Sequence, residues 1–561
     1  MRYHVLASDY DGTLAHHGEV SDETVRALER LRATGRRTVL VTGRIVTDLA
    51  RVFPRLDLFD LVVAENGGTL FDPRRNVERP LAAPPPASFT RLLHQRGVPF
   101  DLGKVILATW EPHQHAVLEA IRELGLGHSV IFNKGGVMIL PEGVNKASGL
   151  AVALSELGLT AHEVVGVGDA ENDHALVTAA ECGVAVANAV PALKDQADLV
   201  TARAWGDGVQ ELADRLVAED LAGADPGRRN VPLGVTAAGP VAFRPGRDRL
   251  LFAGGSGSGK TTAASGLIER LLERGYQLCV IDPEGDYEGF SGLTSLGAAG
   301  RAPTPDEVIS LLSDPAVSPS VNLLGVKLAD RPSWFAGLLP RLQELRGRTG
   351  RPHVWVADEA HHLFPREWQA APAAWPADPG AALFVTLSPD RLAPVLLRSL
   401  TGVVTIGEGA QDGLASFLEA VRLPAVRPPR LAQGEAISWW RRCPDEATAI
   451  RIEPPRAARH RHLRKYAHGD VQEKAFRFRG RDGRLDLRAQ NLELFLQLAE
   501  GVDEDTWAFH LEQGDYERWL LDAIKDPEAA RDVEAVRRSL PASAAESRRR
   551  VREILEQRYM L

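Results

Sequence analysis

Short apolar runs alternate with segments of helical spacing along the first part of the chain. The runs are rich in β-branched residues, which favour strands. We predict strands at Arg37–Val41, Leu61–Ala64, Glu163–Val167 and Gly183–Val186. Strands that alternate with helices in this way are typical of an α/β domain whose sheet is mostly parallel.

A second alternation begins with a strand at Arg249–Ala253, after a stretch rich in glycine and proline. Further strands are predicted at Gln277–Ile281, His353–Ala357, Ala382–Thr386 and Gly402–Ile406. The pattern therefore predicts two doubly wound α/β domains with parallel sheets. Past about residue 471 it becomes helical, which predicts a helical C-terminal domain.

Breaks in these patterns give the expected domain boundaries. The segment of about 73–143 interrupts the first alternation, so we predict an inserted α/β cap there. The first domain should cover residues 1–216, followed by a linker at 217–230. The second α/β domain is expected at 231–460 and the helical domain at 471–561.

Composition and charge narrow the class of protein. Apolar residues make up 44% of the 561 residues and charged residues 25%, a balance that excludes a mainly disordered chain. The net charge of −9 argues against a generally basic nucleic-acid-binding surface but permits a local basic patch. Three widely separated cysteines suggest neither a disulfide framework nor a zinc site.

Targeting signals are not evident in the sequence. The first residues lack the apolar segment and cleavage site of a secretory signal. No stretch approaches the ~20 apolar residues that a membrane helix needs. We therefore expect a soluble, cytoplasmic protein without a membrane partner.

Two aspartates follow the first predicted strand, in the sequence Asp9-Tyr10-Asp11-Gly12-Thr13. Open α/β sheets bind ligands at this edge. Asp9 can attack a phosphoryl group as the nucleophile, and Asp11 can protonate the leaving oxygen and then activate water. Taken alone, the same motif also fits a solvated Asp–Gly turn.

Three later segments supply other groups that phosphoryl transfer needs. Thr42 offers a hydroxyl, and Gly43 and Arg44 offer donors to phosphoryl oxygens. Lys146 can offset charge in the transition state. The segment Gly168-Asp169-Ala170-Glu171-Asn172-Asp173 carries hard oxygen ligands, which suit Mg²⁺. Taken singly, Lys146 also fits a surface lysine, and Asp173 fits a charge at a helix N-terminus.

These motifs occur in the order found in the haloacid dehalogenase (HAD) superfamily. Residues of about 1–215 resemble its Cof-like phosphatases with a C2-type cap, and Glu65-Asn66-Gly67-Gly68 also matches that branch. The resemblance implies an aspartyl-phosphate on Asp9. It implies Mg²⁺ held by Asp9, the Asp11 carbonyl and Asp169, with Asp173 nearby. Asn66 and Asn172 are then candidates for contact with the phosphate or the substrate.

The cap is expected to select the leaving group. Relatives with such caps commonly accept sugar phosphates, so the resemblance implies a phosphorylated small molecule as substrate. Trp110, His113 and His115 are candidate lining residues from the cap, but we favour a surface or packing role for each of them.

The strand Arg249–Ala253 leads into a second chemical motif, which a helical pattern follows. Its residues are Gly254, Gly255, Ser256, Gly257, Ser258, Gly259, Lys260, Thr261 and Thr262. The glycines let backbone N–H groups wrap the phosphates of ATP, Lys260 reaches the β- and γ-phosphates, and Thr261 can bind Mg²⁺. A Gly/Ser linker is the alternative, which the strand before and the helix after disfavour.

The strand His353–Ala357 ends in two acids. Asp358 would belong to the Mg²⁺ shell, and Glu359 would polarise the attacking water. The adjacent glutamate favours hydrolysis over transfer to another substrate. An exposed acidic turn is the alternative.

Residues of about 231–460 resemble the HerA/FtsK group of P-loop ATPases. The resemblance includes Asp282-Pro283-Glu284-Gly285-Asp286-Tyr287. It implies a RecA-like fold that binds and hydrolyses ATP, and members are often ring-forming motors on DNA. The chain departs from the group after Thr386, where relatives often carry a Gln or Asn and this sequence has Leu387-Ser388-Pro389. Arg391 and Arg398 are candidates for an arginine that reaches a neighbouring subunit's nucleotide, but we favour a surface salt bridge for either.

The tail is electrically polarised. Residues 451–490 contain 12 Lys/Arg and 5 Asp/Glu, whereas residues 491–530 contain 2 and 11. The basic cluster could contact nucleic-acid phosphates, but we favour pairing with the acidic segment or with a neighbouring subunit. The cluster comprises Arg456, Arg459, Arg461, Arg464 and Lys465.

Three functions fit the sequence. The first is a Mg²⁺-dependent phosphomonoester phosphatase fused to an ATP-hydrolysing domain that regulates or powers it. The second is a nucleic-acid motor or end-processing protein whose phosphatase removes terminal phosphates. The third is a nucleotide-gated switch that controls assembly of a homo-oligomer. We favour the first because it uses every strong motif.

Overall fold

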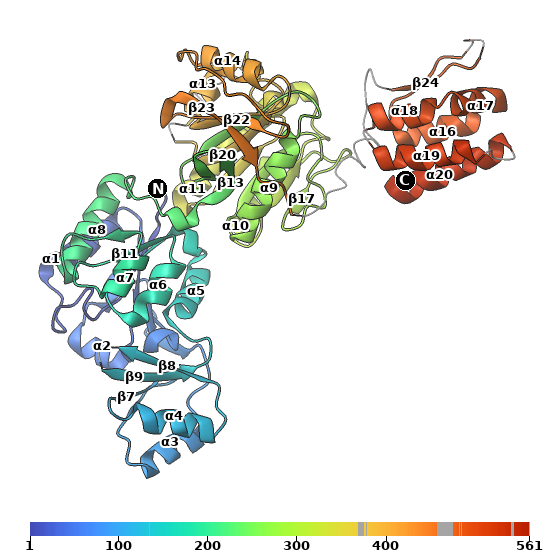
Figure 1. Cartoon of the computed structure of the whole chain (residues 1–561). Helices are drawn as coiled ribbons and strands as arrows, with labels where there is room; N and C mark the ends of the chain where they lie inside the picture. The colour runs from blue at the N-terminus through green and yellow to red at the C-terminus, as the bar shows by residue number, and fades with distance from the viewer. Residues whose placement is uncertain are drawn as a thin grey trace. The chain divides into compact units, whose positions relative to one another are not determined.

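The computed structural model divides the chain into two compact units, and each is described by itself (Figure 1). Unit 1 comprises residues 1–280, 304–319 and 329–453, and unit 2 comprises 281–303, 320–328 and 454–561. The structure describes all residues except 134, 369–374, 377, 457–474, 482, 484, 525, 540–542 and 560–561.

The first part of unit 1 is an α/β layer structure around one large sheet. Its strands are β1 (Val5–Ser8), β2 (Arg37–Val41), β3 (Leu61–Ala64), β4 (Thr69–Asp72), β5 (Val77–Pro80), β10 (Val164–Gly168), β11 (Cys182–Ala185) and β12 (Leu199–Val200). They lie in the order β12-β11-β10-β1-β2-β3-β4-β5. The strands from β12 to β3 are parallel, and β4 and β5 are antiparallel additions.

Helices cover both faces of this sheet. They are α1 (Asp22–Ala33), α2 (Val46–Val52), α5 (Lys146–Leu157), α6 (His174–Ala179), α7 (Pro191–Gln196) and α8 (Trp205–Glu219). Leu6 packs with α1, α2, α7 and α8 on one face, whereas Val5 and Ala7 pack with α5 and α6 on the other. Because side chains alternate between two buried faces, the strands are apolar throughout, as the sequence pattern predicted.

Short 3₁₀ turns connect several of these elements. They are η1 (Leu56–Leu58), η2 (Glu65–Gly67), η3 (Ala161–Glu163) and η4 (Glu171–Asp173). Two of them, η2 and η4, lie beside the candidate active site. Their conformation therefore sets where its polar side chains point.

A second, smaller sheet lies between β5 and α5 in the sequence. Its elements are α3 (Ala87–Gln95), β6 (Asp101–Leu102), β7 (Leu107–Trp110), α4 (Gln114–Glu123), β8 (His128–Asn133) and β9 (Gly136–Pro141). The antiparallel order is β6-β7-β9-β8, and Phe89, Leu107 and Val117 pack its helices onto it. Figure 1 shows this sheet between its own helices and the larger sheet, as a cap would lie.

The cap sheet begins later in the chain than the expected insertion at about 73. The Asp72 carboxylate accepts the N–H groups of Arg74 and Arg75, at 2.9 and 3.2 Å. These bonds turn the chain back, so β5 pairs with β4 in the large sheet. The segment of different character that the sequence showed therefore contains both an edge hairpin and a cap.

The second part of unit 1 contains another large sheet. Strands in or entering this part are β13 (Val231–Thr236), β14 (Gly239–Phe243), β15 (Arg249–Ala253), β16 (Leu278–Asp282), β18 (Pro319–Asn322), β19 (Val354–Ala357), β20 (Ala381–Thr386), β21 (Gly402–Thr405), β22 (Ala436–Trp440) and β23 (Cys443–Ile452). From β14 to β16 the order is β14-β13-β23-β22-β21-β15-β20-β19-β16. The strands β21, β15, β20 and β19 are parallel, while β13, β14, β22 and β23 join by antiparallel pairs.

Helices and short turns accompany this second sheet. They are η5 (Gly227–Arg229), α9 (Lys260–Glu273), α10 (Pro305–Ser313), η6 (Leu328–Asp330), α11 (Arg331–Thr349), η7 (Ala360–His362), η8 (Pro389–Arg391), α13 (Pro394–Ser399) and α14 (Ala410–Ala420). The parallel centre agrees with the predicted second α/β domain. The antiparallel edge strands follow from the two hairpins β13–β14 and β22–β23.

The described C-terminal part of unit 2 is mainly helical. Unit 2 contains β17 (Thr294–Leu296), β24 (Phe476–Phe478), β25 (Leu487–Ala489), α16 (Leu492–Gly501), α17 (Glu504–Glu512), α18 (Asp515–Asp522), α19 (Pro527–Arg538) and α20 (Ala544–Tyr559). Phe495, Trp507 and Tyr516 are central in the core of the C-terminal helices. Of the proposed basic cluster, only Arg456 is described, because Arg459, Arg461, Arg464 and Lys465 lie outside the described residues.

Among the described helices, none combines enough length with enough apolar character to cross a bilayer.

Candidate active sites

Four charged residues from separate segments converge at the carboxyl ends of β1 and β10. Asp9 follows β1, Asp169 follows β10, Asp173 ends η4, and Lys146 is the first residue of α5. The Lys146 ammonium donates to Asp9 Oδ1 and to Asp173 Oδ1, both at 2.5 Å. Carboxylate oxygens of the three aspartates lie within 4.8 Å of one another. The structure therefore brings these four predicted residues together.

Burial makes this charge cluster unusual. The Lys146 and Asp173 side chains are 0% exposed and that of Asp9 is 6% exposed. Burial and the facing carboxylate of Asp173 raise the pKa of Asp9 to about 8. Burial opposes the ammonium charge, yet Asp173 and Asp9 raise the pKa of Lys146 above its ordinary value. The cluster lacks positive charge, since three carboxylates face one ammonium.

Local bonds fix two members of the cluster. The Asp173 Oδ2 atom accepts the N–H groups of Asp169 and Ala170, at 2.9 and 3.0 Å. Asn145 caps α5 by accepting the N–H of Ala147 at 2.9 Å. The N-cap places Lys146 at the first position of its helix, from which its side chain reaches the aspartates.

Asp11 and Arg44 form an ion pair at the edge of the site. Arg44 donates from Nε and Nη2 to the two Asp11 oxygens, at 2.7 and 2.8 Å, and from Nη1 to Asp48 at 2.6 Å. The Asp11 side chain is 43% exposed. In this structure Arg44 therefore binds the proposed acid–base residue.

The remaining predicted phosphate contacts lie where the cap meets the large sheet. Thr42 and Asn66 are fully buried, and the Asn172 side-chain amide donates to Asn66 Oδ1 at 3.3 Å. Met138 of β9 reaches down from the cap, and Asn66 Nδ2 donates to its sulfur at 3.6 Å. The Met138 methyl carbon lies 3.4 Å from where a Cβ on Gly43 would stand. A larger residue at position 43 would press on the cap.

Three residues beside the site were not assigned a role from the sequence. Glu65 is 1% exposed and accepts the backbone N–H groups at 104, 105 and 106, which lead into β7 of the cap. Asn188 donates to the Gly12 carbonyl at 2.8 Å and so supports the turn after Asp9. Met138 is the third. The motif around Glu65 was visible, but only the fold shows its partners.

Cap residues proposed to line the site lie farther out. Trp110, the last residue of β7, is 50% exposed. His113 and His115 lie at the start of α4, half-buried and exposed respectively. Their role in substrate contact stays a prediction.

The second candidate site is built mainly from backbone. The predicted segment from Gly254 to Gly259 connects β15 to α9, and Lys260, Thr261 and Thr262 form the first turn of that helix. Gly257 and Gly259 have φ of 76° and 95°, which L side chains rarely adopt. Lys260 Nζ donates to the Gly255 carbonyl at 2.9 Å. The lysine thus lies along the loop that would hold the phosphates.

The two predicted acids follow β19 in a strained turn. Asp358 is 3% exposed, and its Oδ1 accepts the Glu359 N–H at 2.9 Å. Glu359 has a φ of 39°, and its carboxylate lies 3.4 Å from His361 Nδ1. Because β20 lies between β15 and β19, Thr386 at its end stands between the two motifs, and its hydroxyl lies 3.3 Å from His361.

The two candidate arginines of this part are both exposed. Arg391 ends η8 and Arg398 lies in α13. Neither position tests contact with a neighbouring subunit, so their role stays a prediction.

Comparisons with known proteins agree with this geometry. Residues 6–80 and 100–212 match the haloacid dehalogenase-like hydrolases, and residues 249–327 match the central domain of helicase HerA. Over 223 residues the chain is 31% identical to phosphoglycolate phosphatase of Methanothermobacter thermautotrophicus, covering 98% of that protein and 38% of this chain. The chain belongs to the haloacid dehalogenase-like hydrolases.

Two other relatives are named for substrates that differ from each other. The chain is 29% identical over 218 residues to phosphoglycolate phosphatase 2 of Saccharolobus solfataricus, covering 92% of that protein and 38% of this chain. It is 27% identical over 232 residues to 5-amino-6-(5-phospho-D-ribitylamino)uracil phosphatase of Bacillus subtilis, covering 92% of that protein and 36% of this chain. The molecule is thus a HAD phosphatase fused to a HerA-like domain, as the motifs predicted.

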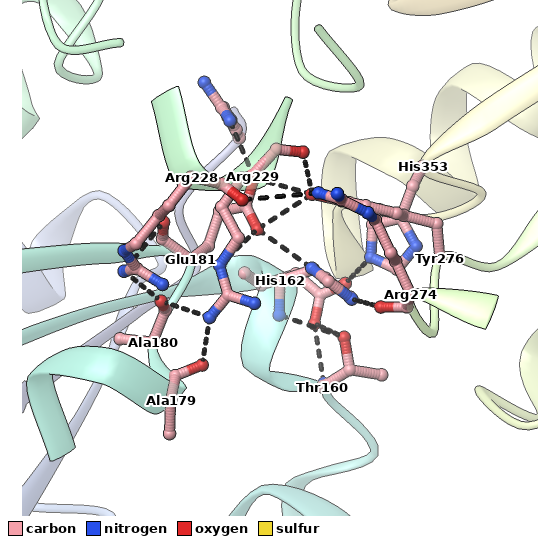
Figure 2. A network of polar contacts seen from close by, with 12 residues as sticks. Thr160, His162, Ala179, Ala180, Glu181, Arg228, Arg229, Arg274, Tyr276 and His353 are labelled. Atoms are coloured by element: carbon pink, nitrogen blue, oxygen red, sulfur yellow. Dashed lines mark hydrogen bonds and ion pairs between the residues drawn. The ribbon is translucent and has the colours of Figure 1, made fainter. Parts of the chain in front are cut away.

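Buried polar contacts join the HAD part to the HerA-like part within unit 1 (Figure 2). The Tyr276 ring stacks on His162 with centroids 3.8 Å apart, and its hydroxyl donates to Glu181 at 3.2 Å. His353 Nδ1 accepts the backbone N–H of residue 277 at 2.8 Å, so its Nε2 donates to Glu163 at 2.6 Å. These contacts use side chains from both parts of the molecule.

The joining residues lie just before strands, away from both candidate sites. Glu163 precedes β10 and His353 precedes β19, whereas Asp169 and Asp358 follow the other ends of these strands. Each candidate site is therefore separated from the junction by the length of one strand.

Proposed function

We propose that residues 1–216 form a Mg²⁺-dependent phosphomonoester phosphatase that works through an aspartyl-phosphate on Asp9. The observation that carries this proposal is the buried cluster of Asp9, Asp169 and Asp173 around Lys146. Burying this much unbalanced charge is costly unless a charged ligand completes the site. A phosphoryl group and a divalent cation together have the required chemistry.

The residues present fit Mg²⁺. Three carboxylates lie close together with one ammonium among them, and Mg²⁺ prefers carboxylate and carbonyl oxygens. Asp9, the Asp11 backbone carbonyl and Asp169 would hold the ion, with Asp173 nearby. When bound, the ion would supply the positive charge that lets the anionic Asp9 approach an anionic phosphate.

The proposed reaction has two displacements at phosphorus. An Asp9 carboxylate oxygen forms a bond to phosphorus while the ester oxygen leaves with a proton from Asp11. Asp11 then takes a proton from water, whose oxygen bonds to phosphorus and releases Asp9 and inorganic phosphate. Lys146, the Thr42 hydroxyl and the Gly43 N–H would hold the phosphoryl oxygens.

The ion pair between Arg44 and Asp11 adds a condition to this scheme. Two hydrogen bonds from Arg44 favour the anionic form of Asp11, whereas the first displacement needs the protonated form. We propose that Arg44 moves from Asp11 to the substrate when the substrate enters. By this exchange Arg44 would bind a phosphoryl oxygen, as the sequence suggested, and release Asp11 to act as the acid.

The substrate is proposed to be a small phosphomonoester of the sugar-phosphate or phosphorylated organic-acid kind. Relatives named for phosphoglycolate and for a phosphorylated ribityl compound support this class. The close approach of Met138 to Gly43 and Asn66 limits the space above the site. A screen of phosphoglycolate, sugar phosphates, nucleotides and phosphorylated DNA ends, with and without ATP, tests this choice.

The HerA-like part is proposed to hydrolyse ATP and to govern the phosphatase. Lys260 and the loop from Gly254 to Gly259 would hold the phosphates, Thr261 and Asp358 would hold Mg²⁺, and Glu359 would polarise water. The buried junction supports a regulatory link, because Glu163 and His353 directly precede the strands β10 and β19, and residues of the two candidate sites follow the other ends of these strands. A change in phosphatase turnover on adding ATP is the expected result.

A second candidate function is the processing of nucleic-acid ends. The match to the central domain of helicase HerA favours it. It predicts that DNA stimulates ATP hydrolysis and that salt weakens DNA binding steeply. If neither effect occurs while small phosphomonoesters are hydrolysed, the first function is supported and this one is rejected.

The decisive test of the phosphatase is the Asp9→Asn variant of the full chain. It should be folded and inactive on every phosphomonoester that the unaltered protein hydrolyses with Mg²⁺. Turnover at the unaltered rate in this variant would refute the aspartyl-phosphate mechanism.

A further inference from the structure

The carboxyl-terminal end of α5 is bound by an arginine from the HerA-like part. Arg351 Nη2 donates to the carbonyl of Gly158, the C-cap residue of α5, at 2.8 Å. The last carbonyls of a helix have no partner within the helix and carry its negative dipole. A buried guanidinium at this position therefore fixes the end of α5 strongly.

The end of α6 is bound in the same way by two arginines that precede β13. Arg229 Nη2 donates to the carbonyls of Thr178, Ala179 and Ala180 at 2.9, 2.6 and 2.7 Å. Arg228 Nη1 donates to the Thr178 carbonyl at 2.8 Å. Figure 2 shows both guanidinium groups against Ala179 and Ala180. Two neighbouring helices thus depend on arginines from outside the HAD fold.

The same two helices carry catalytic groups at their other ends. Lys146 is the first residue of α5, and Asp173 directly precedes the first residue of α6. The backbone hydrogen bonds of a short helix couple its successive turns, so a shift of its C-terminal end also shifts its N-terminal residues. The positions of Lys146 and Asp173 are therefore linked to the arginines at the junction.

Arg351 contacts both parts of unit 1, since Glu163 belongs to the HAD part and Gln277 to the HerA-like part. Its side chain is 1% exposed, its Nε lies 3.9 Å from Glu163, and its Nη1 donates to the Gln277 side chain at 3.4 Å. Gln277 in turn donates to the carbonyls of Asp314 and Val317, both at 2.7 Å. Arg351 also belongs to the loop that joins α11 to β19, the strand that precedes Asp358.

We propose that Arg351 is a positioning residue for the phosphatase, which holds α5 so that Lys146 stays between Asp9 and Asp173. This inference rests on the proposed function of that site. It gives the HerA-like part a direct physical role in phosphatase turnover, although the two sites lie at opposite ends of their sheets. Arg228 and Arg229 perform the equivalent task for α6 and Asp173.

The test uses full-length protein with Arg351→Met and Arg351→Lys, and with Arg348→Met as the matched control. Arg348 lies in the last turn of α11, shortly before Arg351, and its side chain is 66% exposed. With para-nitrophenyl phosphate and Mg²⁺, Arg351→Met should lower kcat by about tenfold or more, because small misplacements of catalytic groups cost that much. KM should change little. Arg351→Lys should restore part of kcat, and Arg348→Met should behave as the unaltered protein.

Hydrogen–deuterium exchange provides a readout that does not depend on activity. In Arg351→Met, exchange should rise along α5 as far as residues 146–149. An unaltered kcat, or an exchange increase confined to the residues around Gly158, would overturn the proposal. If the unaltered protein lacks phosphatase activity, the proposed function fails, while the exchange result still decides whether Arg351 controls α5.

A second variant covers the case in which Arg351→Met does not fold. The double change Arg228→Met and Arg229→Met should raise exchange at residues 171–176 and lower kcat in the same way. A folded double variant with unaltered kcat and unaltered exchange there would contradict the positioning role.

Discussion

The phosphatase site and the nucleotide site of this protein depend on different parts of the chain. The phosphatase site uses charged side chains from four segments, with Lys146 lying 137 positions from Asp9 along the chain. In the proposed nucleotide site, the backbone N–H groups of one continuous loop and the N-terminus of α9 would do most of the binding. Only its two acids come from elsewhere.

This difference has an energetic consequence. The phosphatase cluster buries its carboxylates, and the pKa of Asp9 is raised first by this burial and then by the charge of Asp173. The proposed nucleotide loop instead relies on glycines with positive φ, which let its backbone N–H groups point toward a phosphate. Lys260 already donates a hydrogen bond to a carbonyl of the same loop. The first site should therefore respond strongly to loss of a single charge or ion, and the second should tolerate an empty state. The following predictions test that contrast.

Asp9→Asn should produce the largest effect. Phosphatase turnover should fall by about 10⁴-fold or more, as when a catalytic nucleophile is removed, while ATP hydrolysis stays unaltered. Removing a buried, repelled carboxylate should not lower the unfolding temperature measured in EDTA. A marked loss of stability in EDTA would contradict the account of the cluster as charge-strained.

Glu359→Gln should slow ATP hydrolysis by about 10²-fold or more, the usual contribution of a general base. ATP binding should remain, because the loop from Gly254 to Gly259 is untouched. Binding and hydrolysis assays with radiolabelled ATP measure the two quantities separately. Glu344→Gln, at a side chain that is 70% exposed, is the matched control. Equal rates in both variants would refute the water-polarising role.

Glu65→Gln should produce an intermediate effect on the phosphatase only. The NH₂ group of the glutamine would meet at least one of the backbone N–H donors at 104–106, which now donate to the Glu65 carboxylate, and two donors cannot pair with each other. Leaving a buried donor unpaired costs about 1–3 kcal/mol, so kcat/KM should fall by roughly tenfold as the cap loosens. Steady-state kinetics of this variant and of Glu142→Gln, an exposed residue after β9, make the comparison. Equal kinetics would show that the cap does not need this anchor.

Acidification below pH 6.5, the ordinary pKa of histidine, should weaken the junction. Burial lowers the pKa of His353 below its ordinary value of 6.5, although the contact with Glu163 opposes the shift. Below that value the unfolded chain binds a proton that the native ring rejects, so stability falls as pH falls. Urea midpoints at about pH 7.5 and about pH 5.8 should therefore differ.

His353→Gln should reduce this pH dependence. Part of it should persist, because burial also lowers the pKa values of His4 and His128; His4→Gln and His128→Gln measure that part. Glu163 has a lowered pKa, with burial opposed by His353, so its own contribution is lost only at more acidic pH. A slope that is the same in the unaltered protein and in His353→Gln would refute the assignment to His353.

Much of the fold followed from sequence pattern, since β-branched runs and helical spacing gave the α/β class and most strands to within a residue or two. The position of β5 did not follow, because its pairing with β4 depends on a turn at Asp72 and not on hydrophobicity. The candidate site residues were named from motifs, and their roles stay proposals. The ion pair of Arg44 with Asp11 and the anchor at Glu65 join residues far apart in sequence, and no local pattern specifies them.

The sequence by itself determined the chemistry available to the protein: a motif with paired aspartates after a strand, a glycine-rich loop before a helix, and two acids after another strand. Each of these motifs is local in sequence, because its residues lie within a few positions of one strand end or one helix start. Only the tertiary structure decided that Lys146 lies between Asp9 and Asp173 and that Arg351 holds the far end of its helix. Such arrangements form when tertiary packing brings distant segments together. Burying a charge is favourable only where a partner of opposite charge or a hydrogen bond compensates it.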